Sequence, residues 1–315
     1  MTSLLCETVT GRSMAELLAG RDAVTAADMV ELRLDGVADI DVARALQGRR
    51  GPAVVTCRPA WEGGWFTGTE RDRYRLLAEA LASGAEYVDI EWRATGEAHD
   101  EAFGGLIRSH PSRVVVSTHD FAGLPGDVST RAQAMRRLGA AVIKVAIAAR
   151  RLSDTLPLLE IGAGGDAVVI GMGDAGVPSR LLASRFRSRW TYAGAAAAPG
   201  QMPASRMVEE FRFRSIGPRT ALYGAAGDEV MRSSLPARLN AAFAGAGVDA
   251  VCVPLRAADR DDLDAFGRAL GFAGVIADGA SREEVERWFE RWTGRPFAPG
   301  VTGGTSHGSP EAGRV

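Results

Sequence analysis

The sequence predicts an α/β fold, a (β/α)8 TIM barrel followed by a smaller α/β unit. Short apolar runs rich in β-branched residues recur along the chain, and segments with helical periodicity separate them. This alternation is typical of βα units that build a parallel sheet. The first 217 residues hold eight such runs, the number that closes a barrel, and a length of 315 residues leaves room for a second unit.

The barrel strands are expected at the apolar runs themselves. In chain order, these are Leu4–Val9, Met29–Leu34, Ala53–Cys57, Glu86–Trp92, Arg113–Thr118, Ala141–Ala146, Ala167–Met172 and Trp190–Gly194. Amphipathic segments lie between them, such as Arg71–Ala82 and Thr130–Leu138, and a glycine that can end a helix closely follows each of these two. A helix near Pro203–Phe213 would close the eighth unit.

The chain after Gly217 repeats the alternation on a smaller scale. Strands expected at Ala221–Gly224, Ala250–Leu255 and Gly274–Ala277, each followed by a helical pattern, have the order βαβαβα. The last residues, VTGGTSHGSPEAGRV, are rich in glycine and serine, a composition typical of disorder. We therefore divide the chain into a barrel domain over 1–217, a second domain over 218–297 and a disordered tail over 298–315.

Composition excludes several classes of protein. A net charge of −2 provides no long-range attraction to nucleic acid or to an anionic membrane surface, so neither is expected as a partner. The sequence has no apolar run near the ~20 residues of a transmembrane helix and no signal-peptide pattern, which predicts a cytoplasmic protein. Cys6, Cys57 and Cys252 lie in or beside apolar runs, and we expect buried free thiols.

Polar side chains lie at one end of almost every predicted barrel strand. Catalytic groups of (β/α)8 barrels lie at the C-terminal ends of the strands, where the βα loops begin. From the second strand to the eighth, the ionisable and amide groups at that end are Glu31, Arg33, Arg58 with Glu62 in the following loop, Asp89, His119, Lys144, Arg180 and Gln201. Random placement rarely produces this pattern, which predicts an active site there.

Lys144 is the only lysine among 37 basic residues, and it lies in the apolar run AAVIKVAIAA. A strand lysine can reach the surface or pair with a carboxylate. A central barrel strand offers little solvent, however, and burial disfavours the ammonium form, which would leave an amine able to form a Schiff base with a carbonyl group. Arginine does not deprotonate and cannot replace it in this role. We therefore predict a reactive lysine.

His119 follows the predicted fifth strand. A hydrogen-bonded loop histidine would explain it, and the functional alternative is a general acid/base, because imidazole titrates near neutral pH. The fifth and sixth strands are expected to be neighbours, which would bring His119 and Lys144 together at the barrel mouth. This adjacency favours the catalytic interpretation.

The segment Gly171–Gly176 matches the GxGxxG pattern of dinucleotide sites. That pattern expects an acidic residue about 20 positions later, at the end of the next strand, and none occurs there before Glu209. A tight strand-to-helix turn explains the glycines better, and its helix N-terminus with Arg180 could hold an anion. The sequence also has no Cys/His/Asp spacing typical of a metal site. We therefore expect neither a cofactor nor a metal ion.

Taken together, these motifs resemble those of type I 3-dehydroquinate dehydratases. They occur in the family's order over about residues 3–215, as ELRLD at 31–35, CRPAWEGG at 57–64, YVDIE at 87–91, STHDF at 117–121, IKV at 143–145, SRL at 179–181 and APGQ at 198–201. The resemblance implies a lyase of the shikimate pathway, without metal or organic cofactor, that dehydrates 3-dehydroquinate to 3-dehydroshikimate through a Schiff base.

The resemblance also implies a role for each motif residue. Lys144 would form the imine with the substrate ketone, His119 would remove the adjacent proton, and Glu62 would orient His119. The other six would bind or support the substrate: Arg180 and Arg58 at its carboxylate, Glu31, Arg33 and Gln201 at its hydroxyl groups, and Asp89 from beneath. Members of this family are often dimers, which implies a homodimer.

One position departs from the family's pattern. The family commonly has a serine four residues before the loop glutamine, and this chain has Ala197. Loss of one neutral hydroxyl contact would weaken substrate binding by about 1 kcal/mol and leave the chemistry intact.

The second unit resembles the N-terminal substrate domain of shikimate dehydrogenases over about residues 220–285. Ser233 alone matches that family's Ser-x-Ser pair, and Ile276 and Arg282 stand where the family has an asparagine and a catalytic lysine. The roughly 30 residues that remain are too few for a nicotinamide-binding domain. We therefore expect a degenerate, truncated domain that serves packing, assembly or regulation.

Two other functions remain open. A non-catalytic sensor of quinate-pathway metabolites would bind its ligand without turnover, and a related class I Schiff-base aldolase would use the same barrel and lysine. The retained Lys144, His119 and Glu62 argue against a sensor, as does the lack of a basic DNA-binding segment.

Overall fold

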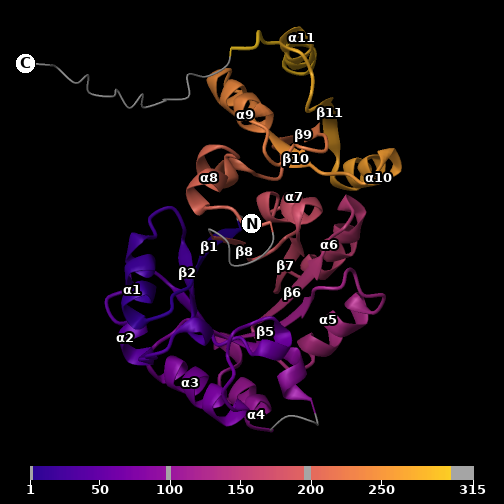
Figure 1. The fold of residues 1–315 in the computed structure, drawn as a ribbon. Coiled ribbons are helices and arrows are strands. Elements are labelled where there is room, and N and C mark those ends of the chain that lie inside the picture. Colours follow the sequence, from indigo (N-terminus) through magenta and orange to yellow (C-terminus); the bar gives the residue numbers. More distant parts are fainter. Residues whose placement is uncertain (1–2, 97–100, 195–199, 299–315) are drawn as a thin grey trace, which may run out of the picture.

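The protein's computed structural model describes residues 3–96, 101–194 and 200–298. Its first part is a barrel whose eight strands are parallel and follow the order β7-β6-β5-β4-β3-β2-β1-β8. The strands are β1 (Leu4–Val9), β2 (Met29–Arg33), β3 (Ala53–Thr56), β4 (Tyr87–Glu91), β5 (Val114–Asp120), β6 (Val142–Ala148), β7 (Ala167–Met172) and β8 (Trp190–Ala193). Figure 1 views this ring with the helices outside it. The predicted (β/α)8 architecture is confirmed.

Eight helices surround the strands. They are α1 (Met14–Ala23), α2 (Val42–Leu46), α3 (Glu70–Ala82), α4 (Glu101–Ser109), α5 (Val128–Arg136), α6 (Leu156–Gly162), α7 (Val177–Leu181) and α8 (Ala204–Glu209). β7 and β8 are joined at their N-terminal ends, where Arg189 donates its backbone N–H to the carbonyl of Ala167 (2.9 Å). Ser188 Oγ accepts the N–H of Val169 (3.1 Å) at the same place.

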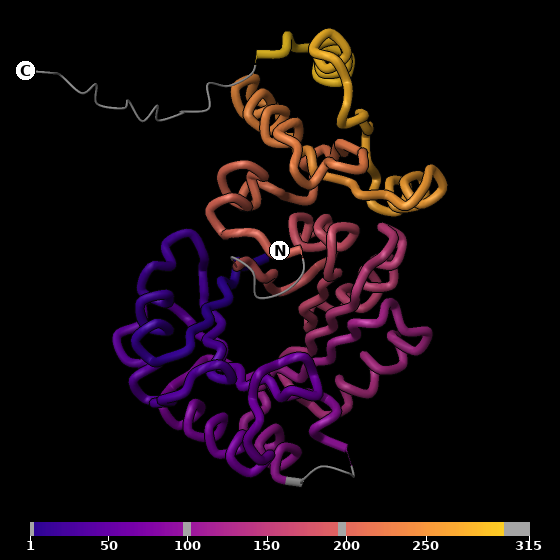
Figure 2. Tube along the Cα trace, in the orientation of Figure 1, coloured from indigo at the N-terminus to yellow at the C-terminus, as the bar shows by residue number. Residues whose placement is uncertain are grey.

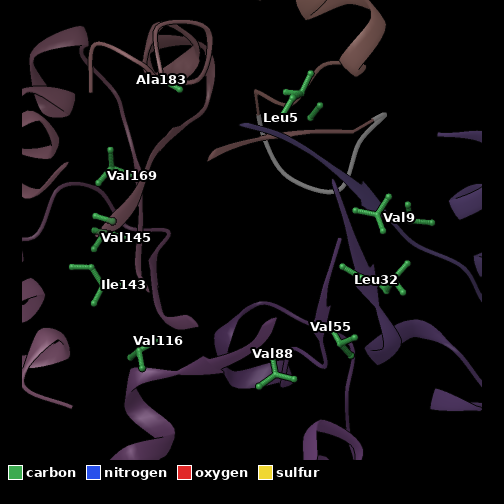
Figure 3. Close-up of a cluster of buried hydrophobic side chains, with 14 of the residues drawn as sticks. Leu5, Val9, Leu32, Val55, Val88, Val116, Ile143, Val145, Val169 and Ala183 are labelled. Carbon is green, nitrogen blue, oxygen red and sulfur yellow. The ribbon is translucent and has the colours of Figure 1, made fainter. Parts of the chain in front are cut away.

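Alternate side chains of the strands form two separate cores, because successive residues of a strand point to opposite faces. Outward-facing residues pack under the helices, and Figure 3 shows labelled members such as Leu32, Val88 and Val169 spread around the ring of strands. Inward-facing residues fill the barrel: Cys6, Met29, Val54, Val115, Val142, Val168 and Trp190. The interior is therefore packed beneath the polar residues at the C-terminal ends.

Within the barrel, the predicted strand bounds are confirmed for β1 and β7 and differ by one or two residues in the other six strands. The largest differences are in β5 and β6, which continue to Asp120 and Ala148 because their ladder pairs His119 with Ala146 and Asp120 with Ile147. His119 thus belongs to the strand, whereas the sequence placed it just after. Backbone pairing continues where the side chains change from apolar to polar, so hydropathy alone misplaced the boundary.

The chain after the barrel forms a second parallel sheet of three strands in the order β10-β9-β11. Its elements are β9 (Ala221–Ala226), α9 (Leu235–Gly245), β10 (Ala250–Leu255), α10 (Arg260–Leu270), β11 (Phe272–Ala277) and α11 (Arg282–Thr293). One face of the sheet shares a core with α9 and α11, while Leu222, Val251 and Val253 join the outer core of the barrel. Figure 2 shows this unit, in orange and yellow, against the part of the barrel that includes α7.

Other expectations concern single residues and the chain's end. Cys6, Cys57 and Cys252 are buried free thiols, as predicted. Ala197 and the tail beyond residue 298 lie outside the described residues. Among the helices that the structure describes, none combines the length and the apolar character needed to cross a membrane.

Candidate active site

A pocket of about 270 Å³ opens at the C-terminal ends of the barrel strands. Eight of the nine predicted site residues line it, namely Glu31, Arg33, Arg58, Glu62, His119, Lys144, Arg180 and Gln201. The ninth, Asp89, is fully buried and contacts both Lys144 and Arg58. The barrel therefore brings together residues that are up to 170 positions apart in the chain (201 minus 31).

Lys144 lies on β6 with its amine in this pocket and only 5% of the residue exposed. Its Nζ atom is 3.1 Å from Asp89 Oδ2 and 3.3 Å from Glu31 Oε1. It also lies 4.2 Å from the centre of the Tyr192 ring, close enough for a cation–π contact. The apolar run around Lys144 contains no acidic neighbour, yet two carboxylates from other strands contact the amine in space.

Asp89 connects Lys144 to Arg58. Its Oδ2 atom is 2.9 Å from Arg58 Nη2, and its Oδ1 atom accepts a hydrogen bond from Ser117 Oγ at 2.5 Å. Burial would raise the pKa of Asp89, but the charges of Arg58 and Lys144 outweigh it and hold this pKa well below the usual range. Asp89 is therefore ionised at neutral pH and fixes two cations at the floor of the pocket.

Arg58 is held from two sides. Its Nη1 atom lies 2.5 Å from Glu91 Oε1 and donates to Ser117 Oγ at 2.8 Å. Burial disfavours its charge, but Asp89 and Glu91 more than compensate and raise the pKa of Arg58. The guanidinium is thus anchored by carboxylates of the protein itself while its surface still lines the pocket.

His119 and Glu62 meet at the rim of the pocket. Glu62 Oε1 accepts the backbone N–H of His119 at 2.9 Å and lies 3.4 Å from its Nδ1 atom. Burial, together with the positive charges of Arg58 and Lys144, lowers the pKa of His119 well below its ordinary value. The imidazole is therefore neutral at pH 7, the state that a general base requires.

Arg180 lies on α7, directly after the glycine-rich turn, and its Nη1 atom donates to the carbonyl of Tyr192 at 3.4 Å. Burial lowers the pKa of Arg180 to about 10, which still leaves the guanidinium protonated at neutral pH. Arg58 and Arg180 therefore differ, because the protein's carboxylates raise the pKa of Arg58 and burial lowers that of Arg180.

The turn before Arg180 explains the GxGxxG match. β7 ends at Met172, a 3-10 turn spans Asp174–Gly176, and α7 starts at Val177. A Cβ atom on Gly176 would lie 2.3 Å from the carbonyl carbon of Gly171, so only glycine allows this close approach. The predicted tight strand-to-helix turn is confirmed.

Glu31 and Gln201 share a threonine at the pocket wall. Thr8 Oγ1 donates to Glu31 Oε2 at 3.2 Å and accepts from Gln201 Nε2 at 3.3 Å. Thr56 Oγ1 donates to the other Glu31 oxygen at 2.9 Å. Both carboxylate oxygens of Glu31 are therefore oriented, and Gln201 is tied to the same cluster.

Arg33 stands nearer the mouth. Its Nε and Nη2 atoms each lie 2.8 Å from an oxygen of Asp35, a bidentate pair. Its guanidinium lies 5.4 Å from the centre of the Trp65 ring. Arg33 is thus fixed in direction before any ligand binds.

The sequence reasoning missed the residues that support this site. Ser117 bridges Asp89 and Arg58, and the ring of Tyr192 packs against the Lys144 amine. Both lie on barrel strands, and Ser117 pairs with Lys144 in the β5–β6 ladder. Strand register could have found Ser117, because it shares a strand face with His119 two residues later.

The pocket combines the buried amine of Lys144 with the imidazole of His119, whose pKa is lowered. Across the described ranges, no group of three or more histidine, cysteine, aspartate or glutamate side chains is arranged to hold a metal ion. The cations around the pocket suit an anionic ligand, and Glu31 with Gln201 can bind hydroxyl groups.

A sequence profile of the type I 3-dehydroquinase family matches residues 5–218, about two thirds of the chain. The chain belongs to the type I 3-dehydroquinase family. Its identity is 31% over 218 residues with the 3-dehydroquinate dehydratase of Desulfotalea psychrophila, covering 64% of this chain and 94% of that protein. The 3-dehydroquinate dehydratase structure from Geobacillus kaustophilus is 28% identical with a TM-score of 0.56, and covers 66% of this chain and 89% of that one.

Matches that reach beyond the barrel involve fused proteins. The bifunctional 3-dehydroquinate dehydratase/shikimate dehydrogenase of Arabidopsis thaliana is 30% identical over 267 residues, which covers 80% of this chain and 44% of that protein. The chain thus spans less than half the length of that relative. The dehydroquinate dehydratase and shikimate dehydrogenase structure from S. pombe covers 91% of this chain and 59% of that one, at 18% identity and a TM-score of 0.55. The second unit therefore shares its fold with part of these fused relatives.

Proposed function

We propose that the protein dehydrates 3-dehydroquinate to 3-dehydroshikimate through a Schiff base on Lys144. The observation that carries this proposal is the single buried lysine on β6, which shares a pocket with a neutral His119. His119 pairs with Ala146 in the β5–β6 ladder, so it lies on the neighbouring strand two residues closer to the C-terminal end than the partner of Lys144. The family match supports the reaction, and the pocket supports the roles below.

The first stage forms the imine. The Lys144 ammonium, held by Asp89 and Glu31, transfers a proton to neutral His119, and the free amine attacks the ketone carbon. The protonated imidazole then gives its proton to the hydroxyl group of the carbinolamine, which leaves as water. A positively charged imine remains on Lys144, and His119 is neutral again.

The second stage eliminates water. His119 removes a proton from the carbon next to the imine, and the electron pair left behind flows into the imine to form an enamine. The enamine then re-forms the imine and expels the hydroxyl group from the next carbon. This hydroxyl group takes the proton from His119 and leaves as water. Hydrolysis of the imine then releases the enone product and restores the Lys144 ammonium. Glu62, which accepts the backbone N–H of His119, holds this base in place through the cycle.

Substrate orientation falls to the rest of the pocket. Arg180 supplies the charge for the substrate carboxylate, with Arg58 as a second cation that is already anchored by Asp89 and Glu91. In this proposal Glu31, Arg33 and Gln201, which line the pocket, bind hydroxyl groups of the substrate, and Asp89 supports the site from beneath.

Borohydride trapping tests the proposal directly. Lys144 is the only lysine, so the amino terminus is the one other primary amine that could be labelled. With 3-dehydroquinate and borohydride, the wild type should lose activity and gain one reduced adduct on the peptide containing Lys144. Lys144→Ala should show neither the adduct nor the rise in absorbance of the enone product. An active Lys144→Ala variant would overturn the mechanism, and binding of 3-dehydroquinate without turnover by the wild type would overturn the function.

We further propose a homodimer, on the strength of the family resemblance. Light scattering of the purified full-length chain tests it, and a mass near 33.2 kDa, that of one chain, would contradict it.

A further inference from the structure

Helix α7, which carries Arg180, is buried on every side. All five of its residues, Val177–Leu181, are buried, although an outer helix of a barrel normally leaves one face in water. The cause is β10 of the second unit, which packs against α7 from outside, as Figure 1 shows. Val251, Val253 and Leu255 of β10 belong to the same apolar core as Val177 and Leu181. The second unit therefore encloses the element that presents Arg180.

The second unit also forms hydrogen bonds with the loop that follows β6, the strand of Lys144. Asp262, in the first turn of α10, is 2% exposed and lies against the 3-10 turn Leu152–Thr155 after β6. Its Oδ2 atom accepts the backbone N–H of Leu152 at 3.0 Å, and its Oδ1 atom accepts that of Ser153 at 2.8 Å. Oδ2 also accepts the N–H of Ala258 at 3.0 Å, within its own unit. One buried carboxylate thus ties the two parts of the chain together.

The Leu152–Thr155 turn is in contact with the turn that precedes Arg180. Thr155 Oγ1 donates to the carbonyl of Leu152 at 2.7 Å, and a Cβ atom on Gly171 would lie 2.9 Å from Thr155 Cγ2. Ser179 Oγ accepts the N–H of Gly171 at 2.8 Å and donates to the carbonyl of Gly176 at 2.7 Å. Arg180 is the next residue. A series of contacts therefore runs from Asp262 through the Leu152–Thr155 turn to Ser179, the residue before Arg180.

We propose that Asp262 is a positioning residue for substrate binding. In this proposal the second unit acts as a brace, which means that its contacts with the barrel fix the position of Arg180. This inference rests on the proposed function, in which Arg180 binds the substrate carboxylate. Small displacements at such a contact change affinity strongly, because charge-assisted hydrogen bonds depend on geometry. The brace acts on binding, whereas the amine of Lys144 is anchored from the far side by Asp89 and Glu31.

Steady-state kinetics of Asp262→Ala and Asp262→Asn in the full-length chain test the brace. The Asn variant keeps the side-chain shape and one acceptor oxygen, and directs an N–H₂ group at backbone donors. We expect KM for 3-dehydroquinate to rise about threefold to thirtyfold in both, with kcat within about twofold, well below the unfolding temperature. Asp261→Asn is the matched control, since it removes the same charge from the same helical turn at an exposed position, and its KM should equal that of the wild type.

Hydrogen exchange separates this inference from the proposed function. In both Asp262 variants, amides of 150–156 and of 171–182 should exchange faster than in the wild type and in Asp261→Asn. An inactive wild type with this exchange pattern would refute the dehydratase function and leave the mechanical link standing. Unchanged KM in a folded Asp262→Asn variant, or faster exchange confined to 150–156, would overturn the brace. A variant that merely unfolds more easily would lose kcat with its active fraction and keep its KM, which also counts against the brace.

Discussion

Asp89 Oδ2 lies 3.1 Å from the Nζ atom of Lys144, beneath the pocket and without any exposure to solvent. The same oxygen is 2.9 Å from Arg58, so one ionised carboxylate serves two cations. This sharing places the nucleophile of the proposed reaction inside a charge network that also includes Ser117 and Glu91. Changes to the network should therefore alter catalysis and stability together.

The Asp89→Asn substitution should lower both the activity and the stability of the protein. The amide can still accept from Ser117 but cannot balance Lys144 and Arg58, and removing one partner of a buried charge pair costs about 3–5 kcal/mol of unfolding free energy. We expect kcat to fall at least about tenfold, because the amine loses an anchor that orients it. Urea unfolding and product absorbance measure the two effects. Wild-type stability with Asp89→Asn would show that the network is not needed to hold the cations.

Arg58 and Arg180 should separate stability from binding. Arg58→Met leaves Asp89 and Glu91 buried without their shared cation, so the unfolding free energy should fall by about 3–5 kcal/mol. Arg180→Met removes a guanidinium whose charge is disfavoured by burial, so stability should change little. Its KM should rise about tenfold to a hundredfold, the effect of losing a charged hydrogen bond worth about 1.5–3 kcal/mol.

The paired measurement is the control for these two variants, since each removes one guanidinium from the same pocket. Equal losses of stability, or a larger rise in KM for Arg58→Met than for Arg180→Met, would contradict the division of roles.

The pH dependence of kcat/KM should reflect a histidine with a low pKa. The groups that face His119 include Arg58 and Lys144, which lower its pKa with burial, and Asp89, which raises it. His119 must be neutral to act as a base, so activity is present above its pKa and is lost as the pH falls through it. Because this pKa lies below the ordinary value of about 6.5, the acid limb of the profile should also lie below about 6.5. Stopped assays across pH 4 to 8 measure it, with circular dichroism at each pH to exclude unfolding. A limb at or above about 6.5 would refute the lowered pKa of His119.

Much of the barrel could be read from residue order. A strand buried on both faces is a short apolar run rich in β-branched residues whatever its neighbours are, so β7 is found at its true bounds. The site residues could be named for a related reason. Parallel strands place their C-terminal ends at one rim, so polar residues that follow different runs, such as Arg58 and His119, must converge.

The charge around each of these residues is a different matter, because it depends on neighbours far along the chain. Nothing near Lys144 in sequence is acidic, yet Asp89 and Glu31, from strands four and two, contact its amine. Arg58 and Arg180 look alike in sequence, and only packing distinguishes them, because Asp89 and Glu91 raise the pKa of Arg58 whereas burial lowers that of Arg180.

The second unit shows the same division most clearly. Its sequence predicted a small parallel sheet resembling a dehydrogenase domain whose motif residues are replaced, such as Arg282 in place of the family's lysine. Its place in the molecule depends on which apolar faces meet and on one buried carboxylate, Asp262, that reaches across to Leu152 and Ser153. Local pattern determines the elements because backbone pairing and burial are local, whereas electrostatics and docking are sums over distant residues that exist only once the chain is folded.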